Sequence, residues 1–239
     1  MSTPRRARQR GMAAVIGLFL VLEGLAVAIL AAAFGFDVVA VGRFGSLMDR
    51  GTDAAELLRW GALLDVGGYL AFGLVILYVG QWLWEQDRLV VAALTASGLA
   101  AVIAGAVGAV LLATVGPWLI VDQGDAARSI LDALGRAVVA GLWGVIVFLL
   151  FGAWTAGVGW LLLGTDRLFG ALALMGGAGM LVTGLRTAAT GRVISEVAGT
   201  LDLLIVLAVV AALLAWFVWL LWLAVRLWTS SCPRPAASA

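Results

Sequence analysis

The chain has 239 residues, of which 64% are hydrophobic and 12% are charged, and its formal net charge is +1. Soluble globular domains are only about half apolar and about a quarter charged, so this composition excludes a soluble protein, a disordered chain and a fibre. With a mean hydropathy of +1.11, the sequence predicts an all-α integral membrane protein with most of its length in the bilayer.

Three features of the composition exclude particular cofactors, metal sites and motifs. The chain has no histidine, which excludes histidine-ligated haem or chlorophyll and histidine-based zinc sites. It has no lysine, which excludes a retinal Schiff base and a phosphate-binding loop ending in Gly-Lys-Ser/Thr. Cys232 is the only cysteine, so an intrachain disulfide and a Cys-rich metal site are excluded. We therefore expect no cofactor and no metal.

Six apolar runs, separated by charged residues, predict six transmembrane helices, because a helix needs about 20 apolar residues to cross about 30 Å of hydrocarbon. The runs are Gly11–Phe36, Trp60–Trp84, Leu89–Val121, Ala137–Leu163, Leu168–Leu185 and Leu203–Val225. The third run is long enough to tilt or to end before Pro117, and the short fifth run leaves full crossing open. The predicted units are a basic N-terminus over 1–10, a membrane domain over 11–227 and a disordered tail over 228–239.

Basic residues set the expected orientation. With six spans both termini lie on one side, and that side carries eight of the arginines against seven on the other. Four of the eight, Arg5, Arg6, Arg8 and Arg10, precede the first span, which predicts that both termini are cytoplasmic in a bacterial inner membrane. The first run is too long for a cleaved signal peptide, so we expect an uncleaved, multi-pass protein.

The segments before the second and fourth runs have helix-start patterns. Asp53-Ala-Ala-Glu56 and Asp125-Ala-Ala-Arg128 each place an aspartate where its carboxylate can cap free amides. Arg128, Asp132 and Arg136 are spaced by four and share one helix face. We therefore expect the even-numbered spans to begin outside the membrane.

Small residues and tryptophans predict how the helices pack. Gly170, Gly177 and Gly184 form a smooth stripe along the fifth span, which predicts a central helix with another helix against it. Trp216, Trp219 and Trp222 recur every three residues in the sixth span. They form either a wall for a flat hydrophobic ligand, such as a quinone or carotenoid, or a lipid-facing ridge, which is the commoner role of tryptophan in membranes.

Glu23, at the centre of the first run, is the leading candidate for a ligand or proton site, because a carboxyl inside a membrane is costly. It is either a proton-carrying, cation-binding or ligand-anchoring group, or a neutral carboxyl bonded between helices. Tyr69 lies at a usable depth for contact with it. Asp65 is expected nearer the outer surface, either paired with Arg59, Arg136 or Arg186 in an outward pocket or solvated at the interface.

No catalytic constellation is present in the sequence. Glu23 and Asp65 are expected to differ in depth by about 10 Å at 1.5 Å per residue, too far for a two-carboxylate site. We therefore expect a non-enzymatic protein that binds a hydrophobic small molecule or serves as an accessory or scaffold subunit. The alternative is a small proton-coupled carrier, with a lipid-modifying enzyme third. Helix breaks at Gly67-Gly68 or Gly176-Gly177, or a cavity reaching Glu23, would favour the carrier. The expected partners are lipid, a small molecule or another membrane protein, and not nucleic acid.

The layout resembles an uncharacterised family of small bacterial membrane proteins with six spans. The segments that carry this resemblance are Arg10–Gly17, Gly51–Asp65 with Leu77-Tyr78, and the turn Arg167–Gly170. The resemblance implies a six-helix fold and no particular activity.

Overall fold

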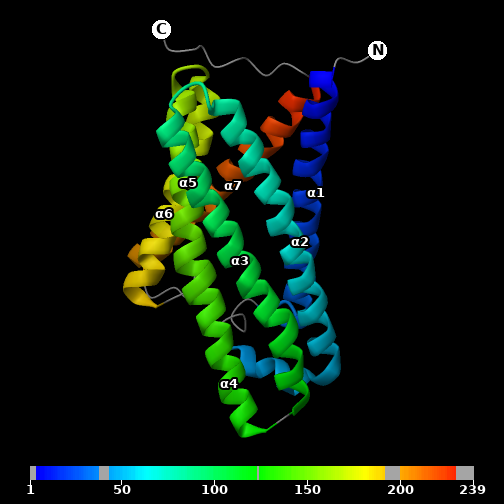
Figure 1. Ribbon diagram of the computed structural model, residues 1–239. Helices are drawn as coiled ribbons and strands as arrows, with labels where there is room; N and C mark the ends of the chain where they lie inside the picture. The colour runs from blue at the N-terminus through cyan, green and yellow to red at the C-terminus, as the bar shows by residue number, and fades with distance from the viewer. Residues whose placement is uncertain (1–3, 38–42, 123, 192–199, 230–239) are drawn as a thin grey trace.

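The computed structural model describes residues 4–37, 43–122, 124–191 and 200–229, and all the regular structure in these ranges is helical (Figure 1). Six helices are long and apolar enough to span a membrane, which confirms the predicted helical bundle and its count of six candidate spans. The elements are α1 (Pro4–Ala33), η2 (Phe44–Arg50), α2 (Gly51–Leu83), α3 (Arg88–Asp122), α4 (Asp125–Arg136), η3 (Ala137–Val147), α5 (Phe148–Leu163), α6 (Arg167–Thr190) and α7 (Thr200–Thr229). Of the predicted tail over 228–239, Trp228 and Thr229 instead belong to α7, and 230–239, with Cys232, lie outside the described residues.

Several helices extend beyond their apolar runs. As predicted, α2 and α4 begin well before the apolar residues Trp60 and Ala137. The capping prediction is wrong, because Arg50 and Gly124 occupy the cap positions and neither helix has a side-chain cap bond. Asp53 and Asp125 lie in the first turns instead, where a negative charge is favoured by the helix dipole. α3 continues through Pro117 to Asp122 rather than ending before it.

The fourth span is a single rod of three segments, α4, η3 and α5. η3 is an 11-residue stretch with π-helical hydrogen bonding, and at its end the Phe148 amide still bonds to the carbonyl of Trp143, five residues back. The uniformly apolar sequence contains no sign of this change in helix type. By contrast, α2 and α6 run unbroken through Gly67-Gly68 and Gly176-Gly177, the two pairs considered as break points.

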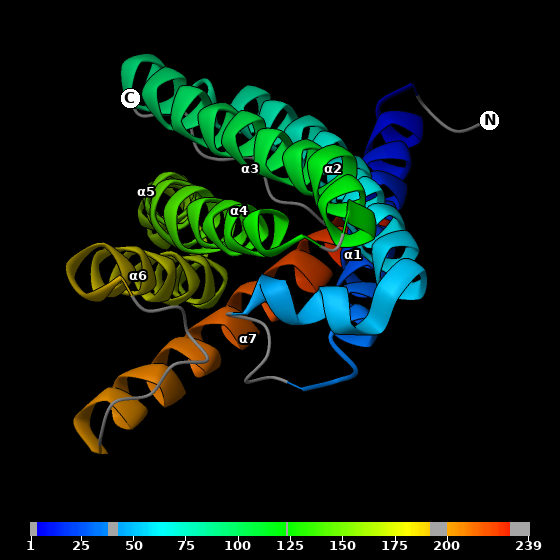
Figure 2. The same cartoon turned by 90° about the horizontal axis from the view of Figure 1, so that it is seen from below.

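The helices pack in sequence-adjacent pairs. α1 and α3 lie along α2, α5 lies along α6, and α7 crosses obliquely from α6 to α1 (Figures 1 and 2). The N-terminal end of α1 and the C-terminal end of α7 lie together at one end of the bundle, which we call the terminal side (Figure 1). η2 and α4 lie at the opposite end, which we call the loop side. Orientation relative to a cell is not implied by these names.

The glycine stripe of α6 packs directly on α5, as predicted. A Cβ at Gly170 would lie 2.7 Å from the Leu163 amide nitrogen and 2.8 Å from the Gly159 carbonyl oxygen. Because no side chain fits there, the two backbones are in contact. The prediction that this helix is central is wrong: α6 lies at one side of the bundle, flanked by α5 and α7 (Figure 2).

Two of the α7 tryptophans belong to the core, whereas Trp228 is 56% exposed. Trp219 is fully buried and Trp216 is 6% exposed, so the expected lipid-facing ridge is wrong for both. Trp216 packs on Phe19 and Phe72, at 6.2 and 5.6 Å between ring centroids. These rings belong to an aromatic core that joins α1, α2, α5, α6 and α7. A second core, around Leu47, Leu58 and Leu131, lies on the loop side.

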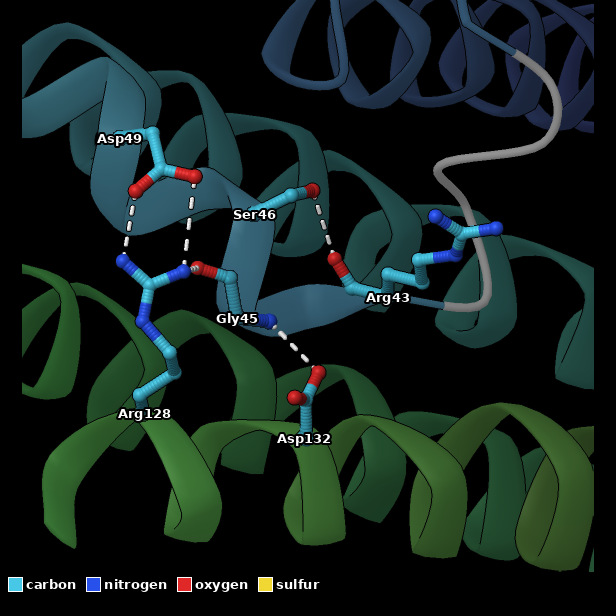
Figure 3. A network of polar contacts seen from close by, with 6 residues as sticks. All are labelled: Arg43, Gly45, Ser46, Asp49, Arg128 and Asp132. Atoms are coloured by element: carbon cyan, nitrogen blue, oxygen red, sulfur yellow. Dashed lines mark hydrogen bonds and ion pairs between the residues drawn. The ribbon is translucent and has the colours of Figure 1, made fainter. Parts of the chain in front are cut away.

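Polar contacts attach η2 to α4 on the loop side (Figure 3). The Gly45 amide donates to Asp132 at 2.6 Å, and Arg128 donates to the Gly45 carbonyl at 3.0 Å and forms an ion pair with Asp49 at 2.6 Å. Arg128 and Asp132 thus share a face, as their spacing predicted. The result is a short helical segment that covers the loop-side core.

On the terminal side, Arg226 forms an ion pair with Asp166 at 2.6 Å and lies over the Phe169 and Trp222 rings, 4.7 and 4.8 Å from their centroids. Asp166 also accepts a hydrogen bond from the Phe169 amide at 3.0 Å and so caps α6. Partial burial opposes ionisation, but the Phe169 amide and Arg226 together hold the pKa of Asp166 below its usual value.

Candidate functional site

A cavity of about 390 Å³ lies between α1, α2, α6, α7 and the η3–α5 part of the fourth span. Its wall is mainly apolar, with several aromatic rings. The lining residues are Phe19, Glu23, Ala26, Val27, Leu30, Asp65, Tyr69, Val139, Trp143, Gly144, Val147, Phe148, Phe151, Met180, Thr183, Thr187, Leu213, Trp216 and Phe217. Five of the six spans thus contribute to one site, and it contains the leading candidate from the sequence, Glu23.

Glu23 and Asp65 meet at the cavity wall, where their carboxyl groups form a hydrogen bond. The expected difference in depth is therefore wrong. α1 and α2 lie side by side in opposite directions, with Leu30 against Gly61 and Glu23 against Gly68, so their register brings Glu23 beside Asp65. The two acids, one from α1 and one from α2, form a single polar centre.

Gly68, one turn beyond Asp65, makes room for this pair. A Cβ at Gly68 would lie 3.0 Å from the carboxyl carbon of Glu23, closer than such atoms normally approach. Glu23 therefore packs across the backbone of α2, and its carboxyl reaches Asp65. The glycine richness of α2 was visible in the sequence, but only the packing of α1 shows which glycine matters.

A hydrogen bond between two carboxyl groups requires a proton on one of them, because a carboxylate has no hydrogen to donate. Asp65 is only 7% exposed. Two adjacent negative charges in such an apolar surrounding would repel strongly. The arrangement therefore favours a pair that holds at least one proton.

The other candidates from the sequence divide into two groups. Tyr69 lines the cavity and stacks on Phe151, 6.5 Å between ring centroids. Arg59 instead pairs with Glu56 at 2.8 Å on the exposed surface of α2, and Arg136 is also exposed. The expected ion pair between Asp65 and either arginine is wrong, as is a solvated Asp65. Among the described residues, no basic side chain lines the cavity.

Two further polar groups lie at the cavity. Sequence reasoning missed Thr187, and it considered Trp216 only as part of an apolar ligand wall or a lipid-facing ridge. The Thr187 hydroxyl and the Trp216 indole nitrogen are buried without a hydrogen-bond partner in the described part of the chain, and both residues line the cavity. Buried polar atoms are usually paired, so these two are available to a bound molecule. A weak signal existed for Thr187, because it follows Thr183 by four residues and shares its helix face.

The π-helical stretch forms one wall of the cavity, through Val139, Trp143, Gly144 and Val147. The Trp143 indole nitrogen donates to the Gly105 carbonyl on α3 at 3.1 Å, which fixes the ring at this wall. π-Helical turns frequently occur at functional sites, where they realign side chains. In the described ranges, no cluster of three or more metal-ligating side chains accompanies the cavity.

No family model matches the chain, and no curated protein or solved structure is significantly similar to it. The resemblance to a six-span family therefore remains an expectation. The function is inferred from the cavity and its lining residues.

Proposed function

We propose that this is a non-enzymatic, multi-pass protein of the bacterial inner membrane, with both termini in the cytoplasm, that binds a hydrophobic small molecule. The observation that best supports this proposal is the Glu23–Asp65 pair at the wall of an apolar cavity of about 390 Å³. Cavities of about 300–1,000 Å³ with apolar walls and a few convergent polar groups are typical of small-molecule sites.

The unpartnered groups of Thr187 and Trp216 support this proposal. A buried donor without a partner costs about 1–3 kcal/mol, a cost that polar groups of a bound molecule would remove. A purely structural role for the polar centre would account for the Glu23–Asp65 bond but not for these two groups.

The shape of the bundle supports entry from the lipid. α7 lies close to α1 on the terminal side and diverges from it toward the loop side (Figure 2). Val27 of α1 and Phe217 of α7 both line the cavity and are 64% and 40% exposed. A hydrophobic molecule dissolved in the bilayer can therefore reach the cavity between these two helices.

A proton-coupled carrier is the second candidate. The observation in its favour is a proton-holding pair inside a cavity that is also lined by the π-helical stretch, a natural place for a helix to bend. The unbroken α2 and α6 favour the binding or accessory function instead. Proton flux in liposomes that depends on an added substrate would favour the carrier.

Native mass spectrometry of protein gently extracted from its own membrane tests the proposal. We expect a small molecule of fixed mass to be retained by the wild type and lost from Ala26→Phe, which places a ring in the cavity. Ala28→Phe makes the same change on the exposed face of α1 and should retain the molecule. Should Ala26→Phe fail to fold, Thr187→Val provides a milder change at the same cavity.

A wild-type protein without any retained small molecule would contradict the proposal. A retained protein partner in its place would make the chain an accessory subunit.

A further inference from the structure

The titratable side chains at the described cavity wall are all acidic, and none is basic. They are Glu23 from α1 and Asp65 and Tyr69 from α2, whereas η3, α5, α6 and α7 contribute only uncharged residues to the wall. α3, which packs behind α2, carries charged side chains only at its ends, Arg88 and Asp122. In the part of the chain that the structure describes, no basic side chain at the cavity wall therefore compensates a negative charge on the carboxyl pair.

The wall around the pair is rich in aromatic rings. Phe19, Trp143, Phe151, Trp216 and Phe217 all line the cavity with Tyr69. The faces of such rings carry partial negative charge and attract cations, most strongly where water is excluded. An apolar, aromatic wall with an acidic centre is complementary to an organic cation whose charge is covered by hydrophobic groups.

We propose that the cavity binds a lipophilic organic cation in exchange for a proton of the Glu23–Asp65 pair. The inference rests on the proposed function and adds the class of ligand. The cation enters the cavity, the O–H bond of the protonated carboxyl breaks, and the proton passes to water. One positive charge replaces another, so the net charge of the buried site is unchanged and the carboxylate that remains is balanced by the ligand.

Other ligand charges fit the site less well. An anion would face two acids with no basic side chain on the described part of the wall. A neutral molecule would leave the carboxyl pair protonated and gain nothing from it. Only a cation turns the unfavourable burial of an ionised carboxyl into a favourable interaction.

Three probes of one shape and different charge test this inference: tetraphenylphosphonium, neutral tetraphenylsilane and the anion tetraphenylborate. Thermal unfolding of the detergent-solubilised protein reports binding of each, since a ligand specific for the folded state raises the unfolding temperature. Calorimetric titration in buffers of different ionisation enthalpy then counts the protons released. We expect tetraphenylphosphonium to stabilise the protein most, with one proton released per cation bound.

The exchange also predicts a pH dependence. Where the pair holds the proton that is exchanged, the apparent affinity for tetraphenylphosphonium should rise about tenfold per pH unit. The double variant Glu23→Gln/Asp65→Asn should lose both the proton release and the pH dependence. The control Glu85→Gln/Asp53→Asn makes the same chemical changes at exposed positions and should behave like the wild type.

The outcomes separate this inference from the proposal on which it rests. Equal stabilisation by tetraphenylsilane, or cation binding without proton release, overturns the inference but leaves a hydrophobic binding cavity. Preferential binding of tetraphenylborate also overturns it. If none of the three probes binds and native mass spectrometry finds no small molecule, both proposals fall. The wild-type measurements decide the matter even if the double variant does not fold.

Discussion

Glu23 of α1 and Asp65 of α2 share a hydrogen bond at the wall of the central cavity, which joins the first two spans through a pair of acids. Arg8 of α1 also donates to Gln81 of α2 nearer the terminal side, so two polar contacts set the register of these helices. The bond between the two acids also places the only two carboxyl groups of the described cavity wall side by side. The first predictions concern this pair.

Replacing Glu23 by leucine should destabilise the protein, because Asp65 would keep its burial and lose its partner. We expect a loss of about 1–3 kcal/mol in the free energy of unfolding, the usual cost of a buried group left without a hydrogen bond. Glu23→Gln can still donate to Asp65 and should cost less. Denaturant unfolding in micelles measures both. Equal stability of the wild type and Glu23→Leu would show that the bond contributes nothing to the fold.

Gly68→Ala should displace the Glu23 side chain. The new Cβ would lie 3.0 Å from the carboxyl carbon of Glu23, and we expect a loss of about 1–3 kcal/mol, as for other overpacked sites. Gly67→Ala is the matched control, because its nearest neighbour is the flexible tip of Leu22 at 3.3 Å. Thermal unfolding of the two variants gives the comparison. A similar midpoint for both would contradict the packing of Glu23 across Gly68.

The close contact between α5 and α6 should be as sensitive to an added methyl group as the contact at Gly68. Gly170→Ala places a methyl group 2.7 Å from a backbone nitrogen of α5, and backbone cannot rotate away. We expect a destabilisation of about 1–3 kcal/mol. Gly24→Ala, in α1, has nothing within 4 Å of its new Cβ and should be neutral or slightly stabilising. Unfolding curves of both variants in the same detergent measure these changes. If Gly170→Ala were as stable as the wild type, the close contact between α5 and α6 would be contradicted.

On the loop side, Asp132 should matter more than Asp49. Asp132 accepts a bond from the partly buried Gly45 amide, so Asp132→Ala should cost about 1–3 kcal/mol and loosen η2 (Figure 3). Asp49 forms an exposed ion pair with Arg128, and Asp49→Ala should have little effect, because solvent screens such pairs. Hydrogen exchange of the η2 amides measures the loosening in each variant. Faster exchange in Asp49→Ala than in Asp132→Ala would contradict the prediction.

Asp166 should make the terminal side sensitive to acid. Its pKa is below the usual value in the folded protein, so its ionisation stabilises the fold above the unfolded pKa, and that contribution is lost as pH falls through the folded value. Unfolding temperatures between neutral and strongly acidic pH should therefore fall less steeply in Asp166→Asn than in the wild type. Asp87→Asn, on the other turn at this side, is the control. Parallel pH profiles for wild type and Asp166→Asn would contradict the ion pair with Arg226.

The spans could be predicted from the sequence because each is a long apolar run between charged residues, a property that does not depend on the rest of the fold. The contact of Gly170 with α5 followed from the same local reasoning. The Glu23–Asp65 pair could not be predicted, because it depends on the register of α2 against α1. The π-helical stretch was equally hidden, since its residues are as apolar as those of an ordinary span.

Trp216 shows a further limit of sequence reasoning. A tryptophan near the middle of an apolar helix is compatible with lipid, core or cavity, and only the oblique path of α7 places this one against both the core and the cavity. The same holds for Thr187, whose free hydroxyl becomes meaningful only beside the other four helices of the site.

Infrared difference spectroscopy of the carboxyl groups tests most directly whether Glu23 and Asp65 share a proton in the cavity. The carbonyl stretch of a protonated carboxyl is well separated from that of a carboxylate. We predict a protonated carboxyl band at neutral pH that disappears in Glu23→Gln/Asp65→Asn and persists in the control Glu85→Gln/Asp53→Asn. A wild-type spectrum with no such band at neutral pH would contradict the shared proton and the proton exchange that depends on it.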